Sequence, residues 1–238
     1  MNATSLSCKP PLPIAVLASG RGSNLEALIA ARDAGQADID IVLVAGDKPQ
    51  ARALRLAEQH GIASLALEPA GFSERAHYDR ALLDRVAEHG AQLIVLAGFM
   101  RILDGRAIAP WNGRIINIHP SLLPKYRGLH THRRVLEAGD SEHGASVHFV
   151  SAELDGGPLI AQVRMPVLAS DTEDSLAARL LPLEHRLLTA VVQAIATGKL
   201  RWSPEGSVFS GRHIPGALEL ASSGFGLHSG KGVQSDAT

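Results

Sequence analysis

The chain has few cysteines, almost no net charge and no long apolar run. Cys8 is the only cysteine among 238 residues, which excludes an intrachain disulfide and fits a reducing compartment. Lys and Arg number 23 against 24 Asp and Glu, so the formal net charge of −1 provides no general attraction for nucleic acid, although it does not exclude a local anion site. No apolar run approaches membrane-spanning length, and residues 1–13 lack the order of a signal peptide. We therefore expect a cytoplasmic protein that acts neither on nucleic acid nor in a membrane.

Hydrophobic residues make up 45% of the chain, which is enough for one sizeable domain or two small lobes around a cleft. Residues 1–12 contain two prolines, with a third at position 13, and read as a flexible leader. Residues 13–200 carry the regular pattern of a single domain. Residues 201–238 form a C-terminal extension that we expect to be largely flexible, with room for a short hairpin over 202–220 and a Gly/Ser-rich end from residue 221.

Short apolar runs alternate with helical spacing through the first half of the domain. The alternation predicts an α/β fold with a Rossmann-like, mostly parallel sheet and helices on both faces. After residue 124 the pattern changes to a short helix, two strands paired as a hairpin, and a long helix over 172–197 that Pro182 should kink or split. The predicted strands are residues 13–18, 39–45, 62–67, 93–97, 114–119, 145–150 and 159–167.

The stretch from Gly113 to Gly128, GRIINIHPSLLPKYRG, carries the most distinctive polar residues. On a strand, Asn117 and His119 point to one face and the intervening isoleucines to the other. Pro120 ends the strand, so the pair sits at a carboxyl end, where ligands bind in open α/β sheets. An amide and an imidazole there can hold a carbonyl oxygen as it gains charge. The alternative is that the pair only caps a loop.

The segment SGRGSN, residues 19–24, follows the first strand and opens a helix. Gly20 and Gly22 permit tight backbone turns and Ser23 or Asn24 could cap the helix, so backbone N–H groups and a helix N-terminus would there meet an anion such as a phosphate. An ordinary strand-to-helix turn uses the same residues for steric reasons. The spacing matches neither G-x-G-x-x-G nor a P-loop, which argues against a dinucleotide or nucleoside triphosphate site.

Five segments occur in a recognisable order: SGRGSNL, LAGFMRIL, NIHPSLLPKYRGLHTH, GASVHFV and ELDGGP. From residue 14 to about 198 the chain closely resembles the phosphoribosylglycinamide formyltransferases, the folate-dependent glycinamide ribonucleotide transformylases of purine synthesis. The resemblance implies one formyltransferase catalytic domain with a nucleotide-binding N-terminal half and a folate-binding C-terminal half. It implies transfer of the formyl group of 10-formyltetrahydrofolate to the amine of N1-(5-phospho-D-ribosyl)glycinamide, in de novo IMP synthesis.

The family's catalytic Asn, His and Asp match Asn117, His119 and Asp155. Asn117 and a protonated His119 would donate to the developing oxyanion, and Asp155 would raise the pKa of His119. Asp155 otherwise reads as a turn residue in Asp-Gly-Gly. His148 reads as a hydrogen-bonded buried histidine.

Binding roles are also implied by the resemblance. Gly22, Ser23 and Asn24 match the phosphate site, and Glu184 matches the acid that binds the ribose hydroxyls. One departure, Leu181 beside Pro182 where the family has a polar residue, puts details of the ribose contact in doubt. Solvent-exposed or core positions would equally explain Arg75, Glu184 and the apolar residues of the folate set. That folate set is Arg75, Met100, Arg101, Ile102, Leu103, Asn117, Ser151, Ala152, Glu153, Leu154 and Asp155.

Relatives acting on other substrates fit less well. A methionyl-tRNA formyltransferase would need a C-terminal nucleic-acid domain, and a formyltetrahydrofolate deformylase usually has an N-terminal regulatory domain. A Rossmann-like oxidoreductase and a binding protein without catalysis are further alternatives. The resemblance implies small-molecule substrates, no metal, and a monomer or a homodimer; the histidines of residues 128–132, GLHTH, lack further ligands.

Overall fold

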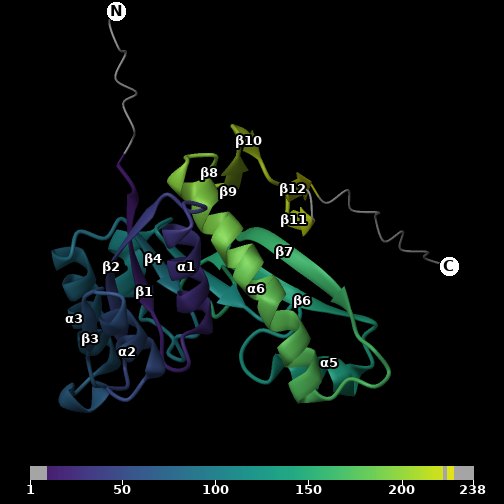
Figure 1. Cartoon of the computed structure of the whole chain (residues 1–238), viewed down its shortest axis with the longest axis horizontal. Coiled ribbons are helices and arrows are strands. Elements are labelled where there is room, and N and C mark those ends of the chain that lie inside the picture. The colour runs from purple at the N-terminus through teal and green to yellow at the C-terminus, as the bar shows by residue number, and fades with distance from the viewer. Residues whose placement is uncertain (1–9, 222–223, 228–238) are drawn as a thin grey trace, which may run out of the picture.

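The computed structural model describes residues 10–221 and 224–227. A nine-stranded sheet runs through the molecule in the order β12-β11-β7-β6-β5-β4-β1-β2-β3 (Figure 1). Its strands are β1 (Leu12–Leu17), β2 (Ile39–Gly46), β3 (Ser64–Ala66), β4 (Leu93–Leu96), β5 (Ile115–His119), β6 (Glu142–Phe149), β7 (Leu159–Pro166), β11 (Leu218–Ala221) and β12 (Gly224–Leu227).

The sheet is mostly parallel, as predicted. Strands β3, β2, β1, β4 and β5, given in their order across the sheet, pair in parallel. In the sequence, each of the five is joined to the next by a segment that crosses over the sheet, so all five run in the same direction. β6 then pairs antiparallel with β5 and with β7, and the predicted hairpin of β6 and β7 is confirmed. Parallel pairing brings the carboxyl ends of β1, β4 and β5 to the same edge of the sheet.

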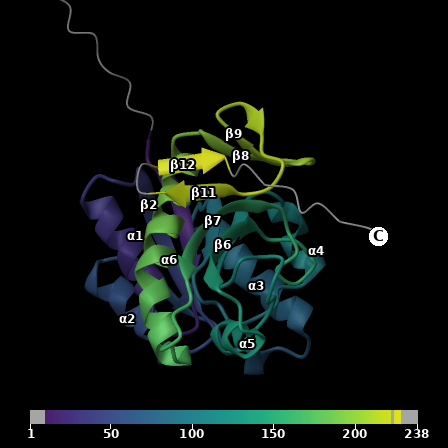
Figure 2. The ribbon, with the colours of Figure 1, turned by 90° about the vertical axis from the view of Figure 1, so that its right-hand side faces the viewer.

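Helices cover both faces of the sheet. α1, α2 and α6 lie on one face, and α3 and α4 lie on the other (Figures 1 and 2). A second, three-stranded sheet of β8 (Leu200–Ser203), β9 (Gly206–Phe209) and β10 (Arg212–His213) follows α6. The helices are α1 (Ser23–Asp33), α2 (Arg52–Gln59), α3 (Arg75–Glu88), α4 (Gly105–Ile108), α5 (Thr131–Ala138) and α6 (Glu173–Ala196), with 3-10 turns η1 (Pro69–Gly71) and η2 (Ala109–Trp111).

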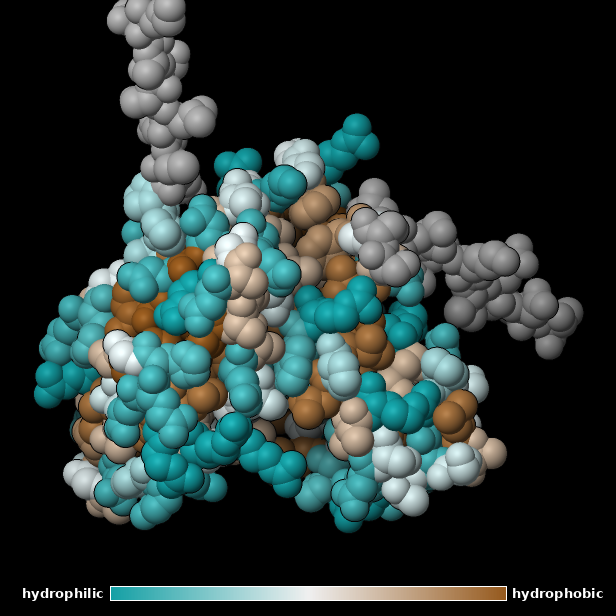
Figure 3. Space-filling view, in the orientation of Figure 1, coloured by the Kyte–Doolittle hydropathy of each residue, from teal (hydrophilic) through white to brown (hydrophobic). Residues whose placement is uncertain are grey.

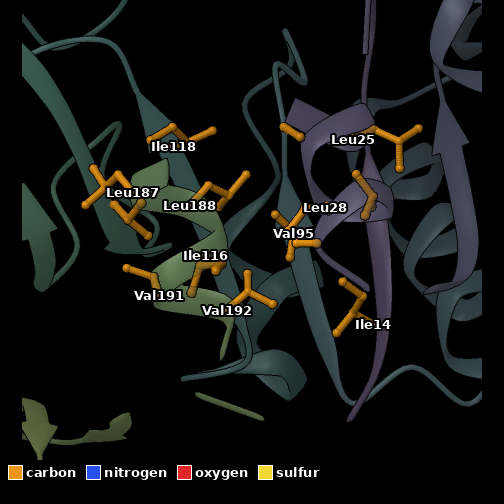
Figure 4. Close-up of a cluster of buried hydrophobic side chains, with 14 of the residues drawn as sticks. Ile14, Leu25, Leu28, Val95, Ile116, Ile118, Leu187, Leu188, Val191 and Val192 are labelled. Carbon is orange, nitrogen blue, oxygen red and sulfur yellow. The ribbon is translucent and has the colours of Figure 1, made fainter. Parts of the chain in front are cut away.

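Two apolar clusters, one on each face, hold these layers together. On the α1 and α6 face, Leu25 and Leu28 pack against β1 and β4, and Leu188 packs against β5 (Figure 4). Ile116 and Ile118 of β5 belong to this cluster, whereas Ile115 belongs to the cluster under α3 and α4. The alternation of β5 therefore leaves Asn117 and His119 on the α3 side, at the end of the strand.

The long C-terminal helix corrects one expectation. Pro182 does not split it, because α6 runs without interruption from Glu173 to Ala196. Thr172 caps the helix with a reciprocal bond to Ser175, as a capping box. Buried leucines and valines flank Pro182 on both sides, and their packing outweighs a hydrogen bond lost at one proline.

The C-terminal extension after residue 200 also differs from what was expected. The short hairpin expected over residues 202–220 is present, since β8 and β9 pair antiparallel, but residues 218–221 and 224–227 also contribute β11 and β12 to the central sheet. β11 pairs in parallel with β7 and so covers what would be the edge of the central sheet (Figure 2). Leu218 is buried there, which propensity in a Gly/Ser-rich stretch does not reveal. The expected leader over residues 1–9 and the remaining tail over 228–238 lie outside the described residues.

Within the part of the chain that the structure describes, no helix has the length and apolar character needed to span a membrane.

Candidate functional site

Asn117 and His119 stand at the carboxyl end of β5, where Pro120 stops the pairing as predicted. His119 is buried and Asn117 is partly buried. Asn117 lies directly opposite His148 of β6, and His119 lies opposite Ser146. Paired residues on neighbouring strands project from the same face of a sheet. The side chains of His148 and Ser146 therefore lie beside those of Asn117 and His119.

Asp155 joins this group from the loop between β6 and β7. Its backbone is left-handed, with φ 48°, a conformation that Asp tolerates better than most residues. Gly157 follows at a position where a Cβ would lie 1.8 Å from the Phe149 carbonyl oxygen, so only glycine lets the loop pass so close to β6. The Asp-Gly-Gly turn is thus the device that turns the Asp155 carboxylate back towards β5.

The Asp155 carboxylate lies close to two N–H donors and two histidine rings. Its Oδ2 accepts a 2.8 Å hydrogen bond from the Gly128 N–H. The same oxygen lies 3.5 Å from His119 Nδ1, and Oδ1 lies 3.5 Å from Asn117 Nδ2. His148 Nε2 is 3.6 Å from Oδ1. The three predicted catalytic side chains therefore converge.

His148 sets the orientation of the Asn117 amide. Its Nδ1 lies 2.9 Å from the Phe149 carbonyl oxygen, so that nitrogen carries a hydrogen and donates. In the neutral ring, Nε2 is then an acceptor, and Asn117 Nδ2 donates to it across 3.1 Å. The prediction of a hydrogen-bonded buried histidine is confirmed, but the strand pairing that places His148 beside Asn117 was not readable from the sequence.

His119 departs from one expectation about its charge. Burial lowers its pKa below the usual value, and this effect outweighs the Tyr126 carbonyl and the Asp155 carboxylate, both of which raise it. Asp155 therefore raises the pKa of His119 as expected, but its effect is smaller than that of burial. His119 Nε2 lies 3.0 Å from the Tyr126 carbonyl oxygen, so Nε2 carries a hydrogen and Nδ1 is the basic atom that faces Asp155.

The two acidic side chains of the site have pKa values shifted in opposite directions. Burial acts to raise the pKa of Asp155, but its contacts with the His148 ring, the Gly128 N–H and the His119 ring hold it at about 2. Burial raises the pKa of Glu184 to about 7, with a weak opposing hydrogen bond from Asn24 Nδ2 at 3.5 Å. Asp155 stays ionised at neutral pH, whereas Glu184 titrates there.

A cavity of about 520 Å³ adjoins these groups. It lies at the carboxyl ends of β4 and β5, where the molecule is notched along the lower edge of Figure 3. Asn24 and Glu184 line one part of it, and the loop after β4 lines another. Its remaining walls come from the end of β5, the segment that leads into α5, the end of β6 with the loop after it, and the start of α6: Asn117, Ile118, His119, Pro120, Gly128, Leu129, His130, Thr131, His132, His148, Val150, Ser151, Glu153, Leu154, Asp155 and Glu173.

Residues 12–192 match the family model for formyl transferases. The chain belongs to the formyl transferase family. It is 45% identical over 202 residues to the phosphoribosylglycinamide formyltransferase of Escherichia coli, covering 85% of the chain and 95% of that protein. The solved phosphoribosylglycinamide formyltransferase from Coxiella burnetii superposes with a TM-score of 0.83 at 40% identity, over 87% of the chain and 99% of that structure. Glycinamide ribonucleotide transformylase 1 from Symbiobacterium toebii gives 0.81 at 37% identity, over 84% and 94%.

Two residues predicted for the phosphate site of this formyl transferase lie beside the cavity rather than in its wall. Gly22 has φ 77°, and a Cβ there would lie 2.9 Å from Ala53 of α2, so glycine is needed for the turn and for helix packing. Ser23 begins α1, and Asn24, the next residue, is the one that lines the cavity. The N-terminus of α1 thus opens towards the same space as Glu184.

Of the residues predicted for folate binding in the formyl transferase, most line the cavity and two do not. Met100, Arg101, Ile102 and Leu103 line the cavity, as do Ser151, Glu153 and Leu154. Arg75 is exposed at the start of α3, and neither it nor the exposed Ala152 contributes to the wall. Their binding roles stay predictions.

Several wall residues of the formyl transferase were missed. GLHTH was considered only as an incomplete metal site, yet this segment supplies part of the cavity wall and the Gly128 N–H that binds Asp155. His132 continues inward to the buried His143, with 2.9 Å between its Nδ1 and His143 Nε2. Burial, reinforced by the charge of His132, lowers the pKa of His143 to about 4. The polar density of GLHTH was the only available signal.

Proposed function

We propose that this chain transfers the formyl group of 10-formyltetrahydrofolate to the amine of N1-(5-phospho-D-ribosyl)glycinamide, in purine synthesis. The observation that carries the proposal is the convergence of Asn117, His119 and Asp155, with contacts of 3.5 Å, beside a cavity large enough for two small molecules. The formyl transferase family and its purine-synthesis members supply the substrate pair. The single cysteine fits a reducing compartment, and we propose a cytoplasmic site of action.

Asn117 supports the negative charge that forms on the formyl oxygen. As the amine nitrogen bonds to the formyl carbon, the carbonyl oxygen becomes an oxyanion, and the Asn117 amide N–H donates to it. His148 Nε2 holds one Asn117 N–H across 3.1 Å, and the other, whose contact with Asp155 Oδ1 is long at 3.5 Å, turns to the oxyanion. The tetrahedral intermediate then collapses, breaking the bond between the formyl carbon and the folate nitrogen.

His119 moves the proton that this exchange requires. The attacking amine loses one proton, and the departing folate nitrogen gains one. His119 is neutral before attack because burial lowers its pKa, and its basic Nδ1 faces the site while Nε2–H is held by Tyr126. Nδ1 accepts the amine proton, and the low pKa makes the imidazolium ready to give it to the folate nitrogen.

Asp155 stabilises the charged state of His119. Its carboxylate, ionised with a pKa of about 2, lies 3.5 Å from Nδ1. The imidazolium formed during proton transfer is thus paired with a fixed negative charge, while Tyr126 accepts from the opposite side of the ring. The ring then has an acceptor at each nitrogen.

The substrates are placed by the two ends of the cavity. We propose that Gly22, Ser23 and Asn24 hold the phosphate at the N-terminus of α1, and that Glu184 accepts hydrogen bonds from the ribose hydroxyls. The apolar side chains of residues 100–103 would cover the flat ring of the folate, with residues 151–155 opposite.

The test is an assay of the unaltered chain with both substrates, following the absorbance change as 10-formyltetrahydrofolate is consumed. We expect formyl transfer, a loss of about 10²–10⁴ in kcat for His119→Ala, and about 10²–10³ for Asn117→Ala. His89→Ala, at an exposed histidine at the end of α3, is the matched control. Absence of transfer by the unaltered chain would refute the function, and near-normal turnover by a folded His119→Ala would refute the mechanism.

A further inference from the structure

In the loop between β4 and α4, two apolar side chains are exposed and the arginine between them is partly buried, the reverse of the usual arrangement in a surface loop. Met100 is 65% exposed and Ile102 is 48% exposed, and both line the cavity. Arg101, between them, has its Nε buried. A surface loop ordinarily buries apolar side chains and leaves arginine in water. Holding two apolar side chains out beside a cavity instead creates a wall for an apolar ligand.

The reversal follows from alternation along an irregular extended segment. Phe99 and Leu103 are buried at 8% and 5% exposure, in the same apolar cluster as Tyr78 of α3. Arg101 shares their side of the loop. If Arg101 turned out into water, the segment would rotate, and Met100 and Ile102 would lose their place in the cavity wall.

Tyr78 holds Arg101 on the inner side. The Arg101 guanidinium carbon lies 4.7 Å from the centre of the Tyr78 ring, in a cation–π contact. Tyr78 is 1% exposed, and the edge contact with Phe72, 5.4 Å between ring centres, fixes the plane of its ring. Among the described residues, neither Arg101 Nε nor Tyr78 OH has a hydrogen-bond partner, and the ring face holds the guanidinium together with attraction to the Asp79 carboxylate next to Tyr78.

The backbone of the same loop is tied on both sides of Arg101. The Met100 N–H donates to Ser19 Oγ across 2.9 Å, and Ser19 is buried behind the N-terminus of α1. The Asp104 N–H donates to Asp79 Oδ2 across 2.7 Å, and Asp79 is fully buried beside Tyr78. With both ends tied, the direction of the Arg101 side chain decides which side chains reach the cavity.

We infer that Tyr78 is a positioning residue for folate binding: by stacking on Arg101 it keeps Met100 and Ile102 turned towards the cavity. The inference rests on the proposed function and specifies how this protein presents its folate wall. Tyr78 itself does not line the cavity, so it acts through the loop and not by touching the folate.

The test compares variants of Tyr78 that remove or retain the ring. Tyr78→Leu removes the ring face at a residue outside the cavity wall, and Tyr78→Phe keeps it. Arg106→Met, at an arginine whose side chain is 84% exposed on α4, is the matched control. Calorimetric titration with 10-formyltetrahydrofolate, without the amine substrate, measures folate binding apart from turnover. Steady-state assays then give KM for each substrate and kcat.

Loss of the stack should raise the Kd and KM for 10-formyltetrahydrofolate about tenfold in Tyr78→Leu, and leave the KM for the amine substrate within about twofold. Tyr78→Phe and Arg106→Met should bind folate as the unaltered chain does. Folate binding by Tyr78→Leu equal to that of the unaltered chain, or equal losses for both substrates, would overturn the inference. If the unaltered chain failed to bind 10-formyltetrahydrofolate, the proposed function would fall first, and this inference with it.

Discussion

Replacing Glu184 with Gln should make the protein more stable and a poorer enzyme. Glu184 lies in α6 and lines the nucleotide end of the cavity, where Asn24 Nδ2 is 3.5 Å from its Oε2. Removal from water raises its pKa from 4.5 to about 7, because the ionised form loses hydration that one long hydrogen bond does not replace. Gln keeps the shape of the side chain and the carbonyl acceptor for Asn24, but it never ionises.

The pKa shift sets the size and the pH range of the effect. A step from 4.5 to about 7, at about 1.4 kcal/mol for each tenfold change in proton affinity, corresponds to roughly 3 kcal/mol against the charged form. Between these pH values the folded state binds more protons at Glu184 than the unfolded state does, so the free energy of unfolding falls as pH rises. Above pH 7 the full cost is present, and below pH 4.5 it is absent.

Urea denaturation at pH values from 4.5 to 8.5 tests this reasoning. Glu184→Gln should exceed the unaltered chain in free energy of unfolding by up to roughly 3 kcal/mol at the basic end, and the difference should vanish at the acidic end. Glu137→Gln, at an exposed glutamate of α5, should show no such pH-dependent difference. In the activity assay, Glu184→Gln should raise the KM for the nucleotide about ten- to hundredfold. A stability difference independent of pH, or a less stable variant above pH 7, would refute the account.

Other predictions concern the remaining charges and the extension. Asp155→Asn should lower kcat about 10²–10³-fold and lower the pKa of His119 further, which NMR titration and turnover would measure; unchanged values would contradict the pairing. Because burial lowers the pKa of His143 to about 4, the unfolded state binds more protons below pH 6.5, so His143→Gln should flatten the loss of stability on acidification; an identical acid profile would contradict this. A chain ending at Gly216 lacks β11 and the buried Leu218, so light scattering should show aggregation through β7 with kcat within about twofold; a monodisperse, equally stable chain would argue against edge protection.

The features that could be predicted from the sequence depend on local pattern. The alternation at β5 placed Asn117 and His119 on one face, and Pro120 marked the end of the strand. The apolar runs predicted a mostly parallel sheet, since strands buried on both faces need continuous apolar residues. The convergence of Asp155 with that pair depended on resemblance, because local pattern does not show how a turn folds back onto a distant strand.

The features that were missed depend on distant contacts. The position of His148 beside Asn117 results from strand pairing. The position of the Tyr126 carbonyl results from the left-handed backbone of Tyr126, with φ 56°. The charge of His119 was misjudged because the sequence identifies an attractive carboxylate but not the extent of burial that opposes it. Arg101 resembles a surface residue until its position over the Tyr78 ring is known.

The opposite shifts of Asp155 and Glu184 separate chemistry from substrate binding in their response to pH. Both carboxyl groups lose water on folding, yet only Asp155 gains enough hydrogen bonds to bring its pKa to about 2, while that of Glu184 rises to about 7. Acidification from pH 8 to pH 6 therefore leaves Asp155 charged and protonates Glu184. His119, with its lowered pKa, keeps its basic Nδ1 through much of that range. The KM for the nucleotide should accordingly rise at a higher pH than the one at which kcat falls, because proton transfer and ribose binding depend on different groups.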